Sequence, residues 1–351
     1  MRKTGFDQQK YVLLQSQHIR ERIQAFGGKL YLEFGGKLFD DYHASRVVPG
    51  FAPDTKIRML MELRDQAEIL LVINASDIEK NKIRGDLGIP YDMDVLRLID
   101  AFREKGLYVG SVVITRYERQ PAAVSFANHL RDLGVPCYYH YPIPGYPADV
   151  QKIMSSEGCG KNDYVPTTRP LVVVTAPGPG SGKMATCLSQ LYHENLRGVQ
   201  AGYAKFETFP VWNLPLDHPV NLAYEAATTD LDDANIVDPF HLKAYNKIAV
   251  NYNRDVEIFP VLDAMFESIY GESPYKSPTD MGVNMIGCCI SDDEAVRYEA
   301  GQEIIRRYYR AMVGQKQGLV APAEVDKMRI LLKQAGLRPE DRPVVAPALR
   351  R

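Results

Sequence analysis

The segment with the clearest chemical signal is a glycine-rich stretch that follows an apolar run. Leu171–Thr175 is apolar or β-branched throughout, and Ala176-Pro-Gly-Pro-Gly-Ser-Gly182 follows it directly. Lys183 then opens a stretch of helical composition. Glycines let backbone N–H groups approach phosphate oxygens, and a helix N-terminus adds partial positive charge. The pattern therefore predicts a phosphate site, with the candidate residues Gly178, Gly180, Ser181, Gly182, Lys183 and Thr186.

This stretch departs from the P-loop pattern G-x-x-x-x-G-K-[ST] at two positions. Pro177 stands where the first glycine belongs, and Met184 stands where the pattern has the hydroxyl that ligates Mg²⁺. Ser181 or Thr186 could supply that hydroxyl instead, or acidic residues alone could hold the metal. The expected cofactor is ATP or another nucleotide with Mg²⁺. A glycine-rich turn without a ligand is the alternative that the pattern leaves open.

A second polar loop follows the first apolar run of the chain, Lys29–Phe34. Its glycines leave backbone donors accessible, and its lysine and arginine attract anionic groups. We expect this loop to hold an anionic substrate opposite the phosphate loop. The alternative is a solvated loop in which an aspartate caps a helix. The candidate substrate contacts are Lys37, Asp40, Asp41 and Arg46.

The acidic residues and histidines predict no definite metal site. His193-Glu194 lacks the second histidine of the H-E-x-x-H motif, because Arg197 occupies that position, so no zinc is expected. The five scattered cysteines do not form a disulfide framework. One acidic cluster near His241 could bind Mg²⁺, although helix caps and Asx turns use the same residue types. Its members are Asp230, Asp232, Asp233 and Asp238.

Strands and helices must bring the two polar loops to one place. Over residues 1–215, apolar runs alternate with amphipathic stretches, which predicts βαβ units and a doubly wound, mainly parallel sheet of the Rossmann-like or P-loop-like kind. Ligands of such sheets lie at the carboxyl ends of the strands, where both loops fall. The expected strands are Lys29–Phe34, Glu68–Asn74, Tyr108–Thr115, Cys137–Tyr141 and Leu171–Thr175; the expected helices between them include Ile57–Asp65, Asp94–Lys105 and Ala122–Leu133.

The sequence pattern changes at residue 216, and residues 216–335 predict a mainly helical second domain. Residues 336–351 contain three prolines and no apolar period, which is typical of a linker or a truncated end. The fold class is therefore α/β followed by a mainly helical domain. The expected helices of the second domain are Val220–Thr228, Pro239–Asn246, Pro260–Tyr270, Asp293–Val313 and Pro322–Ala335.

The composition of the 351 residues disfavours several classes of protein. The net charge of −2 gives no general basic field for nucleic acid or an anionic membrane. No apolar run approaches the roughly 20 residues that cross a bilayer, and the charged N-terminal stretch lacks the apolar centre of a signal peptide. We expect a soluble, cytoplasmic protein with a small phosphorylated ligand and no nucleic-acid or membrane partner. Homo-oligomers remain compatible with the sequence.

Six segments spread along the chain carry motifs of a known family. They are Lys29–His43, Ile78–Gly88, Thr175–Gln190, Gly202–Phe209, Asn251–Pro260 and Tyr275–Asn284. Together they resemble the bacterial domain-of-unknown-function 1846 family. The resemblance implies a Rossmann-like first part and a helical middle, followed in most members by a further α/β domain that this chain lacks. It implies no reaction, and the missing H-E-x-x-H motif gives no support to the zinc-protease label of some members.

The leading interpretation is a nucleotide-dependent enzyme of the phosphoryl-transfer or nucleotide-hydrolysis type, with the phosphates on Gly180–Lys183. The sequence predicts no catalytic residue. The alternative is a non-catalytic phosphorylated-metabolite-binding or regulatory protein, which Met184 favours because a sensor needs no metal-binding hydroxyl. A dinucleotide enzyme is disfavoured, because Phe34-Gly35-Gly36-Lys37 does not match G-x-G-x-x-G.

Overall fold

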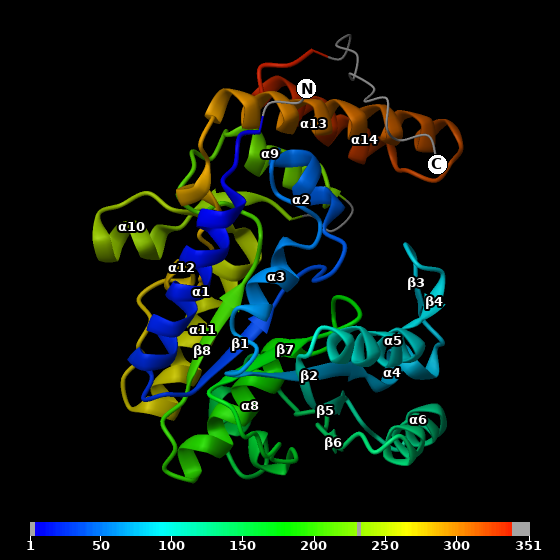
Figure 1. Ribbon diagram of the computed structural model, residues 1–351, viewed down its shortest axis with the longest axis vertical. Helices are drawn as coiled ribbons and strands as arrows, with labels where there is room; N and C mark the ends of the chain where they lie inside the picture. Colours follow the sequence, from blue (N-terminus) through cyan, green and yellow to red (C-terminus); the bar gives the residue numbers. More distant parts are fainter. Residues whose placement is uncertain (1–3, 230–232, 339–351) are drawn as a thin grey trace.

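A computed structural model describes residues 4–229 and 233–338 and is built around one six-stranded sheet (Figure 1). Its strands are β1 (Leu30–Phe34), β2 (Ala67–Asn74), β5 (Tyr108–Thr115), β6 (Cys137–Tyr139), β7 (Leu171–Thr175) and β8 (Gly202–Phe206). They run in the order β6-β5-β2-β7-β1-β8, and every neighbouring pair is parallel. The predicted α/β class with a parallel sheet followed by helices is confirmed.

The two central strands show why these residues form strands. All residues of β2 and of β7 are buried, and most are β-branched or leucine. Such residues suit a pleated surface that is covered on both faces. Val173 of β7 lies in register with Leu32 of β1 on one side and with Ile69 of β2 on the other. The apolar core of the sheet is therefore centred on β7.

Helices cover both faces of the sheet, with α3 and α5 on one face and α8 on the other (Figure 1). The helices of this part are α1 (Gln8–Ala25), α2 (Tyr42–Val47), α3 (Thr55–Met61), α4 (Ala75–Glu79), α5 (Tyr91–Glu104), α6 (Pro121–Asp132), α7 (Val150–Ile153) and α8 (Lys183–Leu196). A short antiparallel pair, β3 (Ile83–Arg84) and β4 (Ile89–Pro90), lies between α4 and α5 along the chain.

The C-terminal part is mainly helical. Its helices are α9 (Pro219–Glu225), α10 (Pro239–Tyr245), α11 (Asn253–Tyr270), α12 (Pro278–Met281), α13 (Asp293–Lys316) and α14 (Pro322–Gln334), and its two strands, β9 (Asn235–Val237) and β10 (Val250–Tyr252), form an antiparallel pair. Helices α13 and α14 pack together beyond α2 and α9, at the top of Figure 1. This places α13 above the loop that follows β1, which matters for the second cavity described below.

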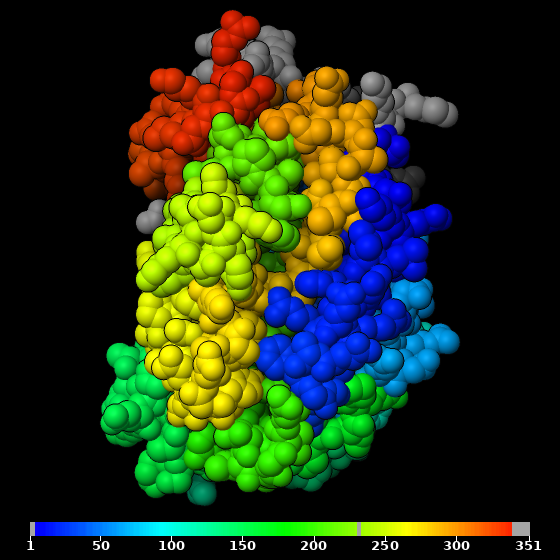
Figure 2. All heavy atoms as spheres, turned by 90° about the vertical axis from the view of Figure 1, so that its left-hand side faces the viewer, coloured from blue at the N-terminus to red at the C-terminus, as the bar shows by residue number. Residues whose placement is uncertain are grey.

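One hydrophobic core extends from Phe6 to Leu332 across the expected domain boundary at residues 215 and 216. In Figure 2, α1 (blue) lies directly against the segment of α11 and α12 (yellow). A hydrogen bond from Gln15 to the backbone oxygen of Val283 is part of this contact. The division into two domains stays a prediction, and most of the expected linker, residues 339–351, lies outside the described residues.

Several elements differ from the sequence-based expectation. The sixth strand, β8, and the N-terminal helix, α1, were not expected, and α11 begins at Asn253 rather than at Pro260. Pro260 lies inside α11, although proline normally begins or breaks a helix. Across the described ranges, no helix is both long and apolar enough to cross a membrane.

Candidate functional site

The loop after β7 ends at the start of α8 in a geometry that suits an anion. Gly182 is the N-cap residue with a φ of +93°, and no side chain caps the helix. Within the described residues, nothing accepts a hydrogen bond from the N–H groups of Lys183, Met184 or Ala185. The first N–H groups of a helix carry partial positive charge and require acceptors. These three donors are therefore available to an anionic group.

The ends of two neighbouring strands hold this loop in place. Asn74, the last residue of β2, donates from Nδ2 to the backbone oxygen of Gly180 at 3.3 Å. Thr115, the last residue of β5, donates from Oγ1 to the backbone oxygen of Ser181 at 2.6 Å. A side chain at Gly182 would also crowd Thr115, with its Cβ 3.1 Å from Cγ2. Both hydrogen bonds engage carbonyl oxygens of the loop rather than its N–H groups.

A cavity of about 610 Å³ opens beside this loop, a volume typical of small-molecule sites. The phosphate-loop residues that line it are Gly180, Gly182 and Lys183. The ends of β5 and β6 supply further lining residues, among them Arg116, His140 and Tyr141. Of the six residues expected to bind phosphate, three thus line the cavity.

The other three expected residues have different surroundings. Gly178 lies against Tyr91, and a Cβ at this position would overlap the tyrosine hydroxyl group. Ser181 and Thr186 are 2% and 0% exposed and do not line the cavity. Neither hydroxyl has a hydrogen-bond partner among the described residues. Thr186 therefore lies on the buried side of α8 rather than at the cavity surface.

Two cations, Lys183 and Arg116, and two carboxylates, Glu33 and Glu118, define the charge of this first cavity. Neither Lys183 nor Arg116 forms an ion pair with any described residue. Arg116 has a φ of +50°, a conformation that costs a non-glycine residue roughly 1 kcal/mol. Glu33 is only 7% exposed. Burial lowers the pKa of His140 to about 3, so its imidazole is neutral.

A second cavity of about 430 Å³ lies over the loop that follows β1. All four expected substrate residues, Lys37, Asp40, Asp41 and Arg46, line it. It shares no lining residue with the first cavity, so the two polar loops serve two separate cavities. The sequence did not identify several other polar residues of this cavity, which include Lys56, Glu207 and Arg307.

Asp41 carries out the capping role that was the alternative interpretation of this loop. Its Oδ1 accepts a hydrogen bond from the N–H of Ala44 at 3.0 Å and so caps α2. Its Oδ2 lies 2.6 Å from Nζ of Lys56. Lys37 pairs with Asp86 at 2.5 Å, on the turn between β3 and β4. The loop is therefore both a capping structure and a cavity wall.

Next to the second cavity lies a buried network of charges centred on Lys205 of β8. Its Nζ lies 2.8 and 2.6 Å from the two carboxylate oxygens of Asp255 and 3.1 Å from Oε1 of Glu207. Although burial lowers the pKa of Lys205, the carboxylates of Asp255, Glu207 and Glu33 raise it well above its usual value. Burial, opposed by Lys205, raises the pKa of Glu207 to about 7. In the sequence, the only signal for this network was the presence of a charged residue within each of the apolar runs that form β1 and β8.

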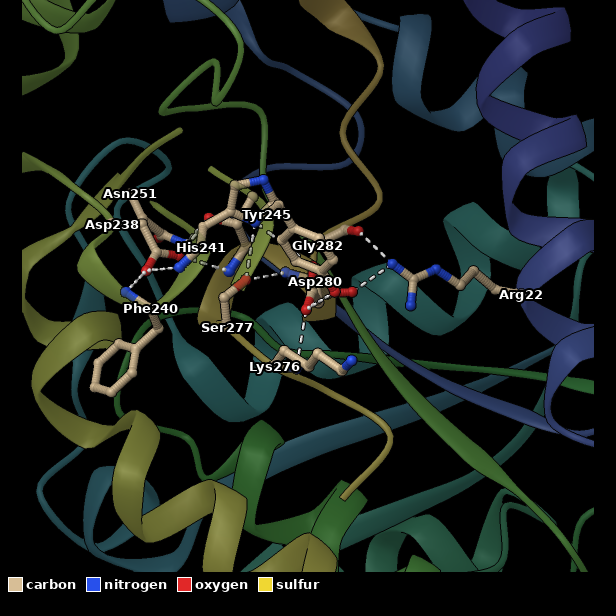
Figure 3. A network of polar contacts seen from close by, with 11 residues as sticks. Arg22, Asp238, Phe240, His241, Tyr245, Asn251, Lys276, Ser277, Asp280 and Gly282 are labelled. Carbon is tan, nitrogen blue, oxygen red and sulfur yellow. Dashed lines mark hydrogen bonds and ion pairs between the residues drawn. The ribbon is translucent and has the colours of Figure 1, made fainter. Parts of the chain in front are cut away.

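The acidic cluster near His241 forms helix caps and ion pairs (Figure 3). Asp238 accepts hydrogen bonds from the N–H groups of Phe240 and His241 at 2.9 and 3.0 Å, and from the hydroxyl of Thr279 at 2.6 Å. Asp233 pairs with Arg254 at 2.6 Å. In the part of the chain that the structure describes, no group of three or more potential ligand side chains is arranged around a metal position. The remaining members, Asp230 and Asp232, lie outside the described residues.

Residues 4–336 match the family model described as "Domain of unknown function DUF1846, N-terminal". The chain belongs to this family. A UPF0371 protein of Streptococcus thermophilus (strain ATCC BAA-491 / LMD-9) is 61% identical over 348 residues, which are 99% of this chain and 70% of that protein. A UPF0371 protein of Streptococcus pneumoniae (strain JJA) is 60% identical with the same coverage. The DUF1846 match includes both cavities and the network around Lys205.

Proposed function

We propose that this DUF1846 protein binds the phosphate groups of a nucleotide or another phosphorylated small molecule at the start of α8. The observation that carries the proposal is the set of free N–H groups on Lys183, Met184 and Ala185 beside a cavity. A phosphate there would accept hydrogen bonds from these donors and gain from the helix dipole. The side chains of Lys183 and Arg116 would neutralise its remaining charge.

The rest of the ligand would occupy the cavity between the ends of β5 and β6. Its volume leaves room for a group much larger than phosphate. Tyr141 and Tyr146 line it and are 38% and 42% exposed, so their rings offer apolar surface to a planar base. This supports a nucleotide as the first ligand to test.

The reaction that we expect is phosphoryl transfer or nucleotide hydrolysis, in which positioning and charge neutralisation supply most of the catalysis. Met184 brings no hydroxyl to the position that ligates Mg²⁺ in P-loop proteins. Ser181 and Thr186 are buried away from the cavity. If Mg²⁺ accompanies the nucleotide, the carboxylates of Glu33 and Glu118 are the acidic groups of the cavity that would hold it.

The same observation favours a second candidate, a non-catalytic protein that binds or senses a phosphorylated metabolite. Backbone N–H groups, Lys183 and Arg116 can hold a phosphate without a metal. Such a protein needs no hydroxyl group to ligate a metal, so Met184 at this position would not weaken ligand binding. Binding should then be independent of Mg²⁺, and no product should form.

Titration of the protein with ATP, GTP and other nucleotides, with and without Mg²⁺, tests the proposal. A ligand at roughly 100 times its dissociation constant should stabilise the fold by about 2.7 kcal/mol, which a thermal melt detects. Mg²⁺-dependent binding with release or transfer of phosphate supports the enzyme. Tight, metal-independent binding without product supports the sensor. If no phosphorylated compound at millimolar concentration shifts the melting temperature, the proposed phosphate site is wrong.

A further inference from the structure

Three arginines share one carboxylate at the junction of α2 and α13. The side chain of Glu303 accepts from Nε of Arg46 at 3.0 Å, from Nε of Arg306 at 3.0 Å and from Nε of Arg307 at 3.1 Å. Glu303 is only 3% exposed. One carboxylate cannot neutralise three guanidinium groups, so this cluster keeps an excess of positive charge in a partly buried place.

The arginines themselves reflect this excess. The pKa of Arg307 is lowered by burial, and the neighbouring Arg46 lowers it further, although Glu303 acts in the opposite direction. Nη2 of Arg306 is buried and has no hydrogen-bond partner among the described residues. Nε2 of His43, which lies next to the cluster, is also buried and also has no hydrogen-bond partner among the described residues. Unpartnered buried donors around a cationic cluster indicate a place where an anion would be favourable.

The cluster opens on the second cavity rather than on bulk solvent alone. Arg46, Arg307 and His43 line that cavity, and so does Lys56, which is only 1% exposed. Gly36 lies directly over the ammonium group of Lys56, since a Cβ at Gly36 would be 3.3 Å from Nζ. No described residue accepts a hydrogen bond from the N–H group of Gly36. Cationic side chains and a backbone donor thus line the same cavity.

Acceptors also line this cavity. No described residue donates a hydrogen bond to the carboxylate of Asp40, which is half-buried. Glu207 also lines the cavity, and its pKa of about 7 lets its carboxyl group accept or donate a hydrogen bond near neutral pH. Hydroxyl groups of a ligand are suited to such partners, because each hydroxyl both donates and accepts. The cavity therefore combines a site for an anion with sites for neutral hydroxyl groups.

We propose that the second cavity binds a small polyhydroxylated molecule that carries one phosphate group, of the sugar-phosphate class. Arg46, Arg307 and Lys56 would bind the phosphate, together with the N–H group of Gly36. Asp40 and Glu207 would bind the hydroxyl groups. The cavity volume of about 430 Å³ suits a ligand of this size. This site is separate from the start of α8, and ligand binding here does not depend on the nucleotide site.

A structural role alone accounts less well for these charges. Lys37 and Lys56 each have a carboxylate of their own, in Asp86 and Asp41. The excess of cations is therefore confined to the three arginines around Glu303, of which Arg46 and Arg307 line the cavity. If the arginines served only to join α2 to α13, the other two guanidinium groups would add repulsion at this junction without a compensating partner.

Isothermal titration calorimetry with glucose 6-phosphate, glucose and inorganic phosphate tests this proposal. We expect glucose 6-phosphate to bind, phosphate to bind more weakly and glucose to give no signal. Arg46→Gln should weaken glucose 6-phosphate binding at least tenfold. The matched control is Arg297→Gln, which removes an exposed arginine of α13 that pairs with Asp293 at 2.6 Å; it should leave the affinity unchanged. Equal affinity in the two variants, or no binding to the native protein at millimolar concentration, would overturn the proposal.

A second variant keeps the test decisive if Arg46→Gln does not fold. Asp40→Asn leaves the arginine cluster intact, and it should weaken glucose 6-phosphate while leaving inorganic phosphate unaffected. Lys183→Ala separates this site from the nucleotide site: it should weaken nucleotides and leave glucose 6-phosphate unchanged. If glucose 6-phosphate responds to Lys183→Ala and not to Asp40→Asn, the sugar-phosphate site is disproved while the nucleotide proposal stands.

Discussion

The hydroxyl group of Tyr203 donates a 2.6 Å hydrogen bond to Oε2 of Glu33 across the neighbouring strands β8 and β1. Tyr203 is fully buried, whereas Glu33 lines the first cavity. Two residues further along β8, Lys205 belongs to the charge network beside the second cavity. Strand β8 therefore supports the polar walls of both cavities, although it was not predicted as a strand.

Replacing Tyr203 by phenylalanine should destabilise the fold. The change leaves the buried carboxylate of Glu33 without this donor, which should cost about 1–3 kcal/mol. Urea unfolding of the two proteins measures the difference. Tyr298→Phe is the control, because Tyr298 is 54% exposed and its substitution should stay within about 0.5 kcal/mol. Equal effects of the two substitutions would show that the hydrogen bond is not important for stability.

Replacing Lys183 by alanine should weaken the phosphorylated ligand without loss of stability. A charge-assisted contact of about 1.5–3 kcal/mol corresponds to a decrease in affinity of roughly 10- to 100-fold. The free protein should be unaffected or slightly more stable, since a cation at a helix N-terminus opposes the helix dipole. Calorimetry and circular dichroism measure the two effects. Lys105→Ala, an exposed lysine that lines neither cavity, is the control. A loss of folded signal in Lys183→Ala would instead make this lysine structural.

Two glycines of the same loop should respond differently to alanine. Gly178→Ala places a methyl group against the hydroxyl of Tyr91, a residue that is 7% exposed, and should cost about 1–3 kcal/mol. Gly180→Ala meets no atom within 4 Å, but its φ of +72° should cost about 1 kcal/mol. Thermal unfolding of both variants compares them. A larger loss in Gly180→Ala would contradict the packing against Tyr91.

Glu207→Gln should change how stability depends on pH. Because the pKa of Glu207 is raised to about 7 in the folded state, its contribution to stability is fully present below about pH 4.5 and is lost as the pH rises through 7. Glutamine cannot ionise, so the variant should gain stability relative to the native protein between pH 5 and pH 8. Allowing for partial exposure, we expect a relative gain of about 1–2 kcal/mol.

Urea unfolding at pH 5 and pH 8 measures this difference between Glu207→Gln and the native protein. The control is Glu267→Gln, an exposed residue of α11 outside the charge network. Its difference from the native protein should be the same at both pH values. A constant difference for Glu207→Gln as well would mean that Glu207 is ionised throughout this range.

The elements with a clean apolar pattern could be predicted from the sequence. Tyr108–Thr115 and Leu171–Thr175 were predicted with the bounds that the structure has, because each is a mainly apolar or β-branched run between polar loops. Strand β8 escaped prediction because Lys205 interrupts its apolar run, and the charge of that lysine is balanced by Glu207 and by the distant Asp255. Pro260 misplaced the start of α11 by one and a half to two turns, since proline usually begins a helix.

The sequence predicted which residues form the two polar loops, but it did not predict how the loops are arranged in space. Each loop was recognised by its glycines and charges directly after a strand. The loops follow the neighbouring strands β7 and β1 and yet line separate cavities, and local sequence carries no information on this separation. Arg307 reaches the second cavity from α13, far along the chain, so no spacing near Arg46 could have revealed it.

The position of β7 between β1 and β2 has a consequence for the synthesis of the protein. Both of its neighbours are translated long before it. Leu30 of β1 therefore cannot pair with Leu171 until β7 has been synthesised. Closing so long a loop is entropically costly, and contacts of such sequence separation slow folding. A nascent chain that ends before Leu171 leaves both edges of β1 and one edge of β2 unpaired, because β8 is also still to be synthesised. The order of the strands therefore makes the unfinished chain a natural client for chaperones on the ribosome.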